Sequence, residues 1–159
     1  MQARRVVGMA MLLAVAAPSF GAVSAGMVAG DPTGLSIKSW QGRHALDFGV
    51  GWYSSRYYYY YDARPYYGRG TELYVTADYV THNYNVFHVN QAKLPVYYGA
   101  GVALWTSFGG AGIRVPVGVD LILARVPIDI FAEIAPTMVL AVGTYFHIGT
   151  AVGVRYRFD

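Results

Sequence analysis

Apolar and polar residues alternate with a period of two along most of this chain, which is the pattern of a β-strand with two different faces. In the stretch IRVPVGVDLIL, which begins at Ile113, every odd position is Ile, Val or Leu. The even positions include Arg114, Pro116, Gly118 and Asp120. The same alternation marks the segments 34–40, 45–52, 72–79, 96–105, 127–140 and 146–158. The pattern therefore predicts an all-β chain.

The two faces of these segments differ from those of a soluble β-sandwich. Opposite the aliphatic face lie Gly, Ala, Asp, Arg and Tyr, with few of the residues that make up an ordinary solvated surface. Small and charged residues suit the crowded interior of a narrow barrel, and a broad aliphatic face suits contact with lipid. Strands of about 9–11 residues cross an outer membrane when they are tilted. We therefore expect a closed antiparallel up-and-down β-barrel that is transmembrane.

The connections between the segments fix the expected topology. Counting hairpins back from the C-terminus puts 41–43, 90–93 and 125–127 on the periplasmic side. The connections at 31–34, 107–111 and 142–145 then face outward, together with the longest one, RYYYYYDARPYYGRG at 56–70. With 26–30 as a short first strand, the count is eight. An even number with the longest loop outside is typical of bacterial outer-membrane barrels.

The N-terminal segment MQARRVVGMAMLLAVAAPSFGAVSA has the features of a signal peptide. Arg4 and Arg5 precede an apolar core at 6–17 that is too short to span a membrane comfortably, and small residues end the segment. We expect removal of residues 1–25, with cleavage before Gly26, and a single domain at 26–159. Because two arginines leave, the net charge falls from +3 to +1, so the charge gives no support for a nucleic-acid partner.

The composition excludes several classes of protein. The chain is 55% hydrophobic and only 13% charged, yet it has no run of 18 apolar residues beyond the signal, so membrane-spanning helices are not expected. It has no cysteine, which excludes disulfides and thiolate metal ligands. We expect no cofactor and no metal, and a location in the bacterial outer membrane.

The chain resembles small bacterial outer-membrane β-barrel proteins of the OmpX and OmpA-transmembrane kind, and an uncharacterised family of exported outer-membrane barrels. The matching segments are 30–40, 94–101, 113–120, 128–136 and 153–158, and the resemblance covers nearly all of the chain after the signal except the tyrosine-rich loop. The closing GVRYRF is similar to the signal read by the barrel-assembly machinery, with Gly153, Tyr156 and Phe158 in register; Ala151 and Asp159 depart from that signal. The resemblance implies a fold and a location, with outer-membrane lipid, lipopolysaccharide and the assembly machinery as partners. It implies no activity.

Alternation places a set of charged residues on the inward face of the expected barrel, with His147 and Tyr97 nearby. Four are positive and five are negative, and near-balance is required because an unpaired buried charge costs several kcal/mol. One interpretation is a salt-bridge plug that fixes the shape of the barrel, and the other is a narrow polar path for small solutes. The interior of an eight-stranded barrel has room for little beyond side chains, which favours the plug. The nine residues are Lys38, Asp47, Asp78, Arg114, Asp120, Asp129, Glu133, Arg155 and Arg157.

The sequence gives little support for catalysis. Its four histidines are His44, His82, His88 and His147, and none forms the His-x-Ser pair of lipid A deacylase barrels or has the spacing of metal ligands. We therefore expect a non-enzymatic protein of the envelope. Two alternatives stay open: a soluble exported lipocalin-like barrel with an apolar ligand, and a lipid A-modifying enzyme.

The loop at 56–70 holds seven of the 15 tyrosines and three arginines. Its tyrosines can extend the neighbouring strands and contribute to an aromatic belt. Arginine pairs well with phosphate, and tyrosine offers a rigid amphipathic surface to sugars or proteins, so one hypothesis is contact with lipopolysaccharide or a surface ligand. The alternative is an insertion that a loop tip tolerates. The residues are Arg56, Tyr57, Tyr58, Tyr59, Tyr60, Tyr61, Arg64, Tyr66, Tyr67 and Arg69.

Overall fold

The computed structural model describes residues 21–61, 64–89, 92–106, 110–140 and 144–158, with side chains except at 53–70, 72 and 88–89. Their regular structure consists of antiparallel β-strands, so the expected all-β antiparallel class is confirmed. Within this part of the chain no helix is long and apolar enough to cross a membrane. Residues 1–20 of the expected signal peptide lie outside the described residues. The strands are β1 (Val23–Gly30), β2 (Thr33–Gln41), β3 (His44–Tyr61), β4 (Arg64–Asn83), β5 (His88–Val89), β6 (Ala92–Lys93), β7 (Val96–Trp105), β8 (Gly110–Arg114), β9 (Val117–Leu123), β10 (Ile128–Val139) and β11 (Tyr145–Phe158).

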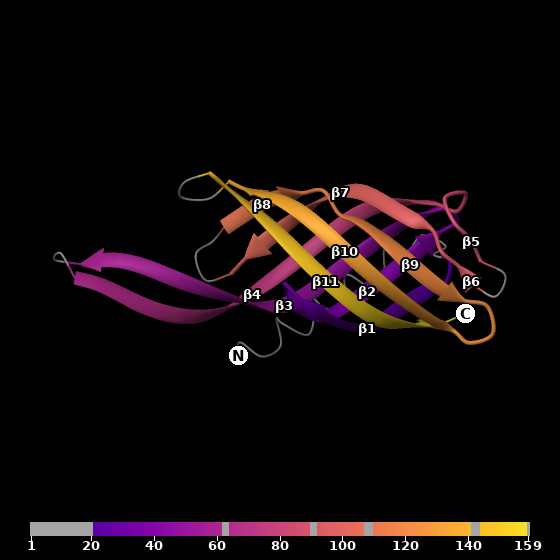
Figure 1. The fold of residues 1–159 in the computed structure, drawn as a ribbon, viewed down its shortest axis with the longest axis horizontal. Coiled ribbons are helices and arrows are strands. Elements are labelled where there is room, and N and C mark those ends of the chain that lie inside the picture. The colour runs from indigo at the N-terminus through magenta and orange to yellow at the C-terminus, as the bar shows by residue number, and fades with distance from the viewer. Residues whose placement is uncertain (1–20, 62–63, 90–91, 107–109, 141–143, 159) are drawn as a thin grey trace, which may run out of the picture.

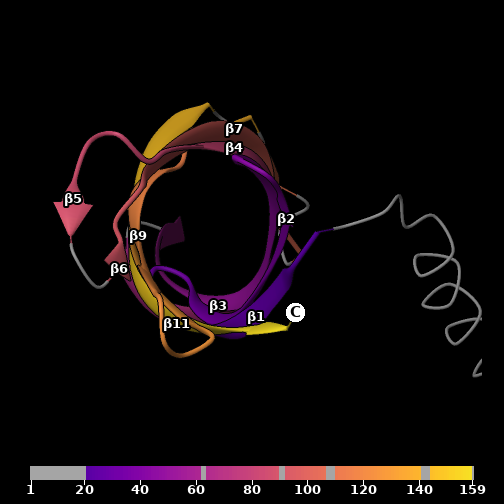
Figure 2. The same ribbon diagram turned by 90° about the vertical axis from the view of Figure 1, so that its right-hand side faces the viewer.

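The strand pairings run around a ring and return to the starting strand. The order is β1, β2, β3, β4, β7, then β8 followed by β9, then β10 and β11, and β11 pairs with β1 from Val23↔Phe158 to Gly30↔Ala151. The ring therefore has eight strand positions, and Figure 2 shows them around a common axis. Most neighbours in the ring are consecutive in sequence, because tight turns favour antiparallel neighbours. The short hairpin β5–β6 lies beside β9 at one end of the ring.

The expected strand at 113–123 is interrupted in the structure at Val115 and Pro116. Proline has no N–H to donate, so a strand assignment breaks there. Backbone hydrogen bonds bridge the interruption on both sides: Val115 N donates to the carbonyl of Pro136 at 2.9 Å, and Gly99 N donates to the carbonyl of Pro116 at 3.0 Å. As a result β8 and β9 occupy one position in the ring, both paired with β7 and β10.

The first strand is longer than the sequence pattern indicated. β1 begins at Val23, three residues before the expected cleavage position, and its register with β2 and β11 includes Ser24 and Ala25. Ahead of it, the carbonyl of Ala22 accepts a hydrogen bond from the backbone N–H of Trp40 at 2.9 Å. The residues directly before Gly26 are therefore part of the folded ring.

The two ends of the ring differ (Figure 1). At the C-terminal end, where β11 finishes, lie the turn at Gly42 and Arg43, the hairpin β5–β6 and the connection at 124–127. Gly42 has a φ of +66°, in the left-handed region that glycine adopts without strain. The periplasmic connections expected from sequence thus share one end of the ring.

At the opposite end, the ribbon end, β3 and β4 continue beyond their neighbours as a two-stranded ribbon (Figure 1). Neighbouring strands stop at the pairs Thr33↔Trp52 and Tyr74↔Trp105, whereas β3 and β4 stay paired from Tyr53↔Glu72 to Tyr61↔Arg64. We name residues 53–61 and 64–72 the ribbon. The segment 56–70, expected as an external loop, is therefore largely strand, because β3 and β4 stay paired along it.

Burial alternates along the ring strands. In β10, Ile130, Ala132 and Ile134 are exposed, while Asp129 and Phe131 are buried. Inward-facing residues gather in two apolar clusters and a set of charged side chains between them. The cluster at the C-terminal end comprises Trp40, Ala45, Val80, Tyr97 and Ile122, and the cluster at the ribbon end comprises Tyr74, Ala103, Trp105 and Val139.

Candidate functional site: an ionic network inside the ring

All nine charged residues expected to face inward lie inside the ring. Glu133 and the half-buried Arg157 retain some exposure, and the other seven are buried. They come from β2, β3, β4, β8, β9, β10 and β11, so the network connects almost the whole circumference. Each is placed by the two-residue period of its strand, which turns every second side chain to the axis.

The centre of the network joins Lys38 and Arg155 to Asp47 and Asp120. Lys38 Nζ lies 2.7 Å from Asp120 Oδ2 and 3.8 Å from Asp47 Oδ2. Arg155 Nη2 lies 2.6 Å from Asp47 Oδ2, and its Nη1 lies 3.6 Å from Asp120 Oδ1. Ser36, which was not expected in the network, donates to Asp47 at 3.0 Å and accepts from Arg155 Nε at 2.9 Å. Each charge therefore faces at least one opposite charge.

A second group surrounds Arg114 towards the ribbon end. Its guanidinium contacts Asp78 Oδ2 at 3.2 Å and also pairs with Glu133. The hydroxyl of Tyr97 donates to Glu133 at 2.9 Å. Gly101 makes room for this group, because a Cβ there would collide with the carboxylate of Asp78. Glycine on the inward face thus accommodates large charged side chains, as the sequence pattern indicated.

A third group lies towards the C-terminal end. Arg157 Nη1 is 3.2 Å from Asp129 Oδ1, and Ser24 Oγ donates to Asp129 Oδ2 at 3.0 Å. The indole N–H of Trp40 donates to Ser24 Oγ at 3.0 Å. Sequence reasoning missed Ser24 because it assigned that residue to the signal peptide.

His82 is a further member of the network that the inward set did not include. It is 1% exposed, and its Nε2 lies 2.9 Å from Asp120 Oδ2. Its ring contacts Trp40 and Tyr97, with centroids 4.5 and 5.4 Å apart. The signal was available: continuing the alternation of Thr76 and Asp78 by two further steps reaches His82.

Aromatic rings contact two of the buried cations. Lys38 Nζ lies 4.7 Å from the ring centre of Trp40 and 4.4 Å from that of Tyr97, while the Arg155 guanidinium lies 3.7 Å from Phe131. Such cation–π contacts are worth about 2 kcal/mol or more when desolvated. A cavity of about 40 Å³ remains beside Ser36, Asp78 and Arg155. The interior is therefore filled by side chains and closed by an apolar cluster at each end.

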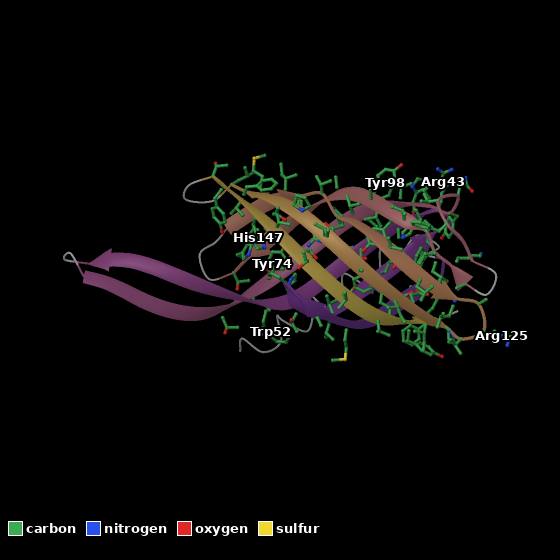
Figure 3. All side chains as sticks on the ribbon, in the orientation of Figure 1. Arg43, Trp52, Tyr74, Tyr98, Arg125 and His147 are labelled. Carbon is green, nitrogen blue, oxygen red and sulfur yellow. The ribbon has the colours of Figure 1, made fainter. Side chains whose placement is uncertain are left out.

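The outer face of the ring is apolar. Met27 is 72% exposed, Leu35 57% and Ile134 54%, whereas Lys38 and Asp120 inside are 0% exposed. At the outward positions of the ring strands, the described side chains include no Asp, Glu, Lys or Arg. Exposed aromatic residues lie near both ends: Trp52, Tyr145 and Phe146 near the ribbon end, and Tyr79, Tyr98, Tyr156 and Phe158 near the C-terminal end, as the labelled Trp52 and Tyr98 illustrate in Figure 3.

The other histidines occupy different settings. His44 faces outward near the C-terminal end, where its Nδ1 lies 3.0 Å from the hydroxyl of Thr81 on the neighbouring strand. Sequence spacing could not reveal this contact, because the partners lie on β3 and β4. His147 pairs with Asp31 at 3.3 Å at the ribbon end. His88 has its side chain outside the description, and no group of three metal-ligating residues occurs in the described ranges.

The remaining expected residues lie at the margins of the ring. Gly153 is buried in β11, whereas Tyr156 and Phe158 face outward with their rings 5.0 Å apart. In the ribbon, only the backbone register is defined: Arg56 pairs with Arg69, Tyr58 with Tyr67, and Tyr59 with Tyr66.

Comparison with protein-family models, curated proteins and solved structures gave no significant match. The resemblance to small outer-membrane barrels therefore stays a prediction from the residues themselves.

Proposed function

We propose that the chain is an integral outer-membrane β-barrel protein with a non-enzymatic role, in which the ring spans the membrane and the ribbon projects from it. One observation carries the proposal: the usual arrangement of a protein in water is inverted. Ionic groups fill the interior, and aliphatic side chains cover the outside. Each large apolar side chain left in water forfeits about 1.5–3 kcal/mol of burial energy, and soluble monomers rarely expose contiguous apolar patches beyond a few hundred Å².

The dimensions and the ends of the ring support this proposal. β7 has 10 residues and β10 has 12, which suits the roughly 9–11 residues of a tilted transmembrane strand. A closed ring leaves no unpaired strand edge in hydrocarbon. Aromatic residues near both ends match the girdles that mark the two membrane interfaces. The barrel-assembly machinery is the expected partner of the closing strand, through Gly153, Tyr156 and Phe158.

The interior supports a structural role over transport. Charges are paired across the axis, and the clusters that contain Trp40 and Trp105 close the two ends. Solute would have to break buried ion pairs to pass, at a cost of several kcal/mol for each. The network therefore acts as a plug that ties distant strands together and fixes the shape of the barrel.

The ribbon supplies the surface function in this proposal. The backbone register of the ribbon places Tyr58 opposite Tyr67 and Tyr59 opposite Tyr66. The same register places Arg56 opposite Arg69. The arginines of this segment suit the phosphate groups of lipopolysaccharide, since the arginine guanidinium binds phosphate through two hydrogen bonds.

The two alternative functions make different demands on the site. A soluble lipocalin-like carrier needs an apolar interior for its ligand, whereas Lys38, Asp120 and Arg155 fill the centre of this one. A lipid A-modifying enzyme needs an activated nucleophile, and the nearest arrangement is the His44–Thr81 contact at the outer face.

Membrane fractionation tests the proposal. Expressed with its own N-terminal segment, the chain should remain in the outer-membrane fraction through high salt and alkaline carbonate, and detergent should release it as a heat-modifiable band on gels. Release into buffer would refute the spanning barrel and favour the soluble carrier. In the same strains, deletion of residues 53–72 should leave membrane insertion intact and reduce binding to lipopolysaccharide. A separate variant, Thr81→Val, tests the lipid A-modifying enzyme: unchanged lipid A acylation in this variant would argue against that function.

A further inference from the structure

Three residues that line one cavity inside the ring each carry a buried polar atom with no hydrogen-bond partner among the described residues. The atoms are Asp78 Oδ1, Arg114 Nε and Arg155 Nη1, and the three residues are at most 5% exposed. Arg114 Nε lies 3.2 Å from Asp78 Oδ2 without the geometry of a hydrogen bond, and Arg155 Nη1 lies 3.6 Å from Asp120 Oδ1. A polar group buried without a partner is costly, because it has lost its hydrogen bonds to water. The three atoms therefore point to a ligand in the cavity.

The chemistry of these atoms selects the kind of ligand. The N–H groups of the two guanidinium ions can only donate, whereas the oxygen of Asp78 accepts. A cation would bond to Asp78, but the two guanidinium ions would repel it. An anion would bond to the guanidinium ions, but Asp47 and Glu133, which also line the cavity, would repel it.

Water both donates and accepts, so it can bond to all three atoms. The result does not depend on whether Asp78 carries a proton, because water accepts from a carboxylic acid as readily as it donates to a carboxylate.

The size of the cavity fits the same ligand. Its volume is about 40 Å³. A buried water needs roughly 10–15 Å³ of such space and two to four polar partners, so the cavity has room for about two or three water molecules. The hydroxyl-bearing residues Ser36 and Thr76 line it as well. Space and polar partners are therefore both sufficient for water, and the space is too small for a larger polar ligand.

The cavity lies between two of the ionic groups described above. Among the described residues, the ion pairs of Arg155 and those of Arg114 involve different carboxylates, so they stay within their own groups. Both groups line the cavity: Ser36, Asp47 and Arg155 belong to the centre, and Asp78, Arg114 and Glu133 to the group towards the ribbon end.

We propose that this cavity is a binding site for a cluster of about two or three water molecules, which bond to Asp78, Arg114 and Arg155. The cluster joins the two ionic groups into one network that connects β4, β8 and β11. The proposal concerns the interior alone, so it does not depend on where the ring resides.

High-resolution crystallography of the intact protein tests the proposal directly. Crystals grown with rubidium chloride as the only salt distinguish water from a cation, because rubidium scatters anomalously. We expect solvent density within hydrogen-bond distance of Asp78 Oδ1 and of at least one of the two guanidinium atoms, with no anomalous peak. An anomalous peak in the cavity would overturn the proposal. So would a cavity without density in a map that resolves waters bound at other sites of the protein.

Two variants of matched shape test the same ligand in solution. Ala151 lines the cavity and shares the inward face of β11 with Arg155. Valine and threonine have the same shape and are both β-branched, so crowding and strand propensity affect Ala151→Val and Ala151→Thr alike. Both side chains displace water, but only the hydroxyl of threonine can replace a hydrogen bond that the water made.

Urea unfolding of the two variants should therefore differ in a defined direction. The ratio of unfolded to folded chains should be about two- to tenfold higher for Ala151→Val than for Ala151→Thr, as expected for one hydrogen bond. An equal ratio, or a lower one for Ala151→Val, would contradict a hydrated cavity, because a dry cavity favours the methyl group over the hydroxyl.

Discussion

Replacing Asp120 by asparagine removes a buried negative charge that faces Lys38, Arg155 and the ring of His82. Asp120 is 0% exposed, and its oxygens lie 2.7 Å from Lys38, 2.9 Å from His82 and 3.6 Å from Arg155. Asparagine keeps the shape of the side chain and an acceptor, so the change acts mainly through charge. In this variant, the ammonium group of Lys38 keeps its contact with the carboxylate of Asp47, at the longer distance of 3.8 Å. Breaking a buried ion pair on one side costs about 3–5 kcal/mol, which multiplies the ratio of unfolded to folded chains by a factor of roughly 150–5,000.

Urea unfolding in lipid vesicles measures this loss. Tryptophan fluorescence reports it, since Trp40 belongs to the cluster next to the network. The matched control is Asp31→Asn, which removes the carboxylate of the partly exposed pair with His147 and should cost at most about 1 kcal/mol. Adding Lys38→Met to Asp120→Asn should recover part of the loss, because it removes a buried cation that has lost its closest carboxylate. Equal unfolding of Asp120→Asn and Asp31→Asn would refute the view that this network stabilises the ring.

Three further predictions address the outer face, the plug and the first strand. Ile134→Arg puts a charge on the lipid-facing side of β10 and should make folding into vesicles less favourable by about 2–4 kcal/mol. The loss is measured as a weaker heat-modifiable band on gels, and unimpaired folding would contradict the assignment of Ile134 to the lipid-facing side. The purified protein should show no steady conductance in planar bilayers, and a stable current would contradict the plug. Intact mass of protein purified from membranes should give an N-terminus at or before Ala22, because Trp40 bonds to the Ala22 carbonyl and Ser24 bonds to Asp129; a chain beginning at Gly26 would contradict that role of β1.

Much of this fold follows from the two-residue period. The period alone assigns Lys38, Arg114 and Asp120 to the inner face, because a strand turns alternate side chains to opposite sides whatever its neighbours are. Which acid meets which base does not follow from it. The contact between Lys38 and Asp120 depends on the shear of the ring, which places residues 82 positions apart at the same height along the axis.

The features that sequence reasoning missed have local causes. The alternation of apolar and polar residues runs through Pro116 without a break, so the sequence pattern does not show that the strand is interrupted there. The interruption follows from the backbone hydrogen bonds, in which Gly99 N donates to Pro116 and Val115 N donates to Pro136. The ribbon lacks alternation because consecutive tyrosines fill odd and even positions alike, so no period marks the segment as a strand. Ser24 looked like part of a cleavage motif, since small residues serve equally at a protease site and against a crowded barrel interior.

The central claim concerns orientation, and site-directed spin labelling of two adjacent residues on β10 tests it most directly. Ile134 is 54% exposed and Ala135 is 5% exposed, and the chain has no cysteine, so Ile134→Cys and Ala135→Cys each introduce a single attachment site. In vesicles, a nitroxide at 134 should be relaxed strongly by lipid-soluble oxygen and weakly by a water-soluble nickel chelate, while the label at 135 should be poorly accessible to both. Strong relaxation of the label at 134 by the nickel chelate, with little effect of oxygen, would show that the aliphatic face meets water and would contradict the account.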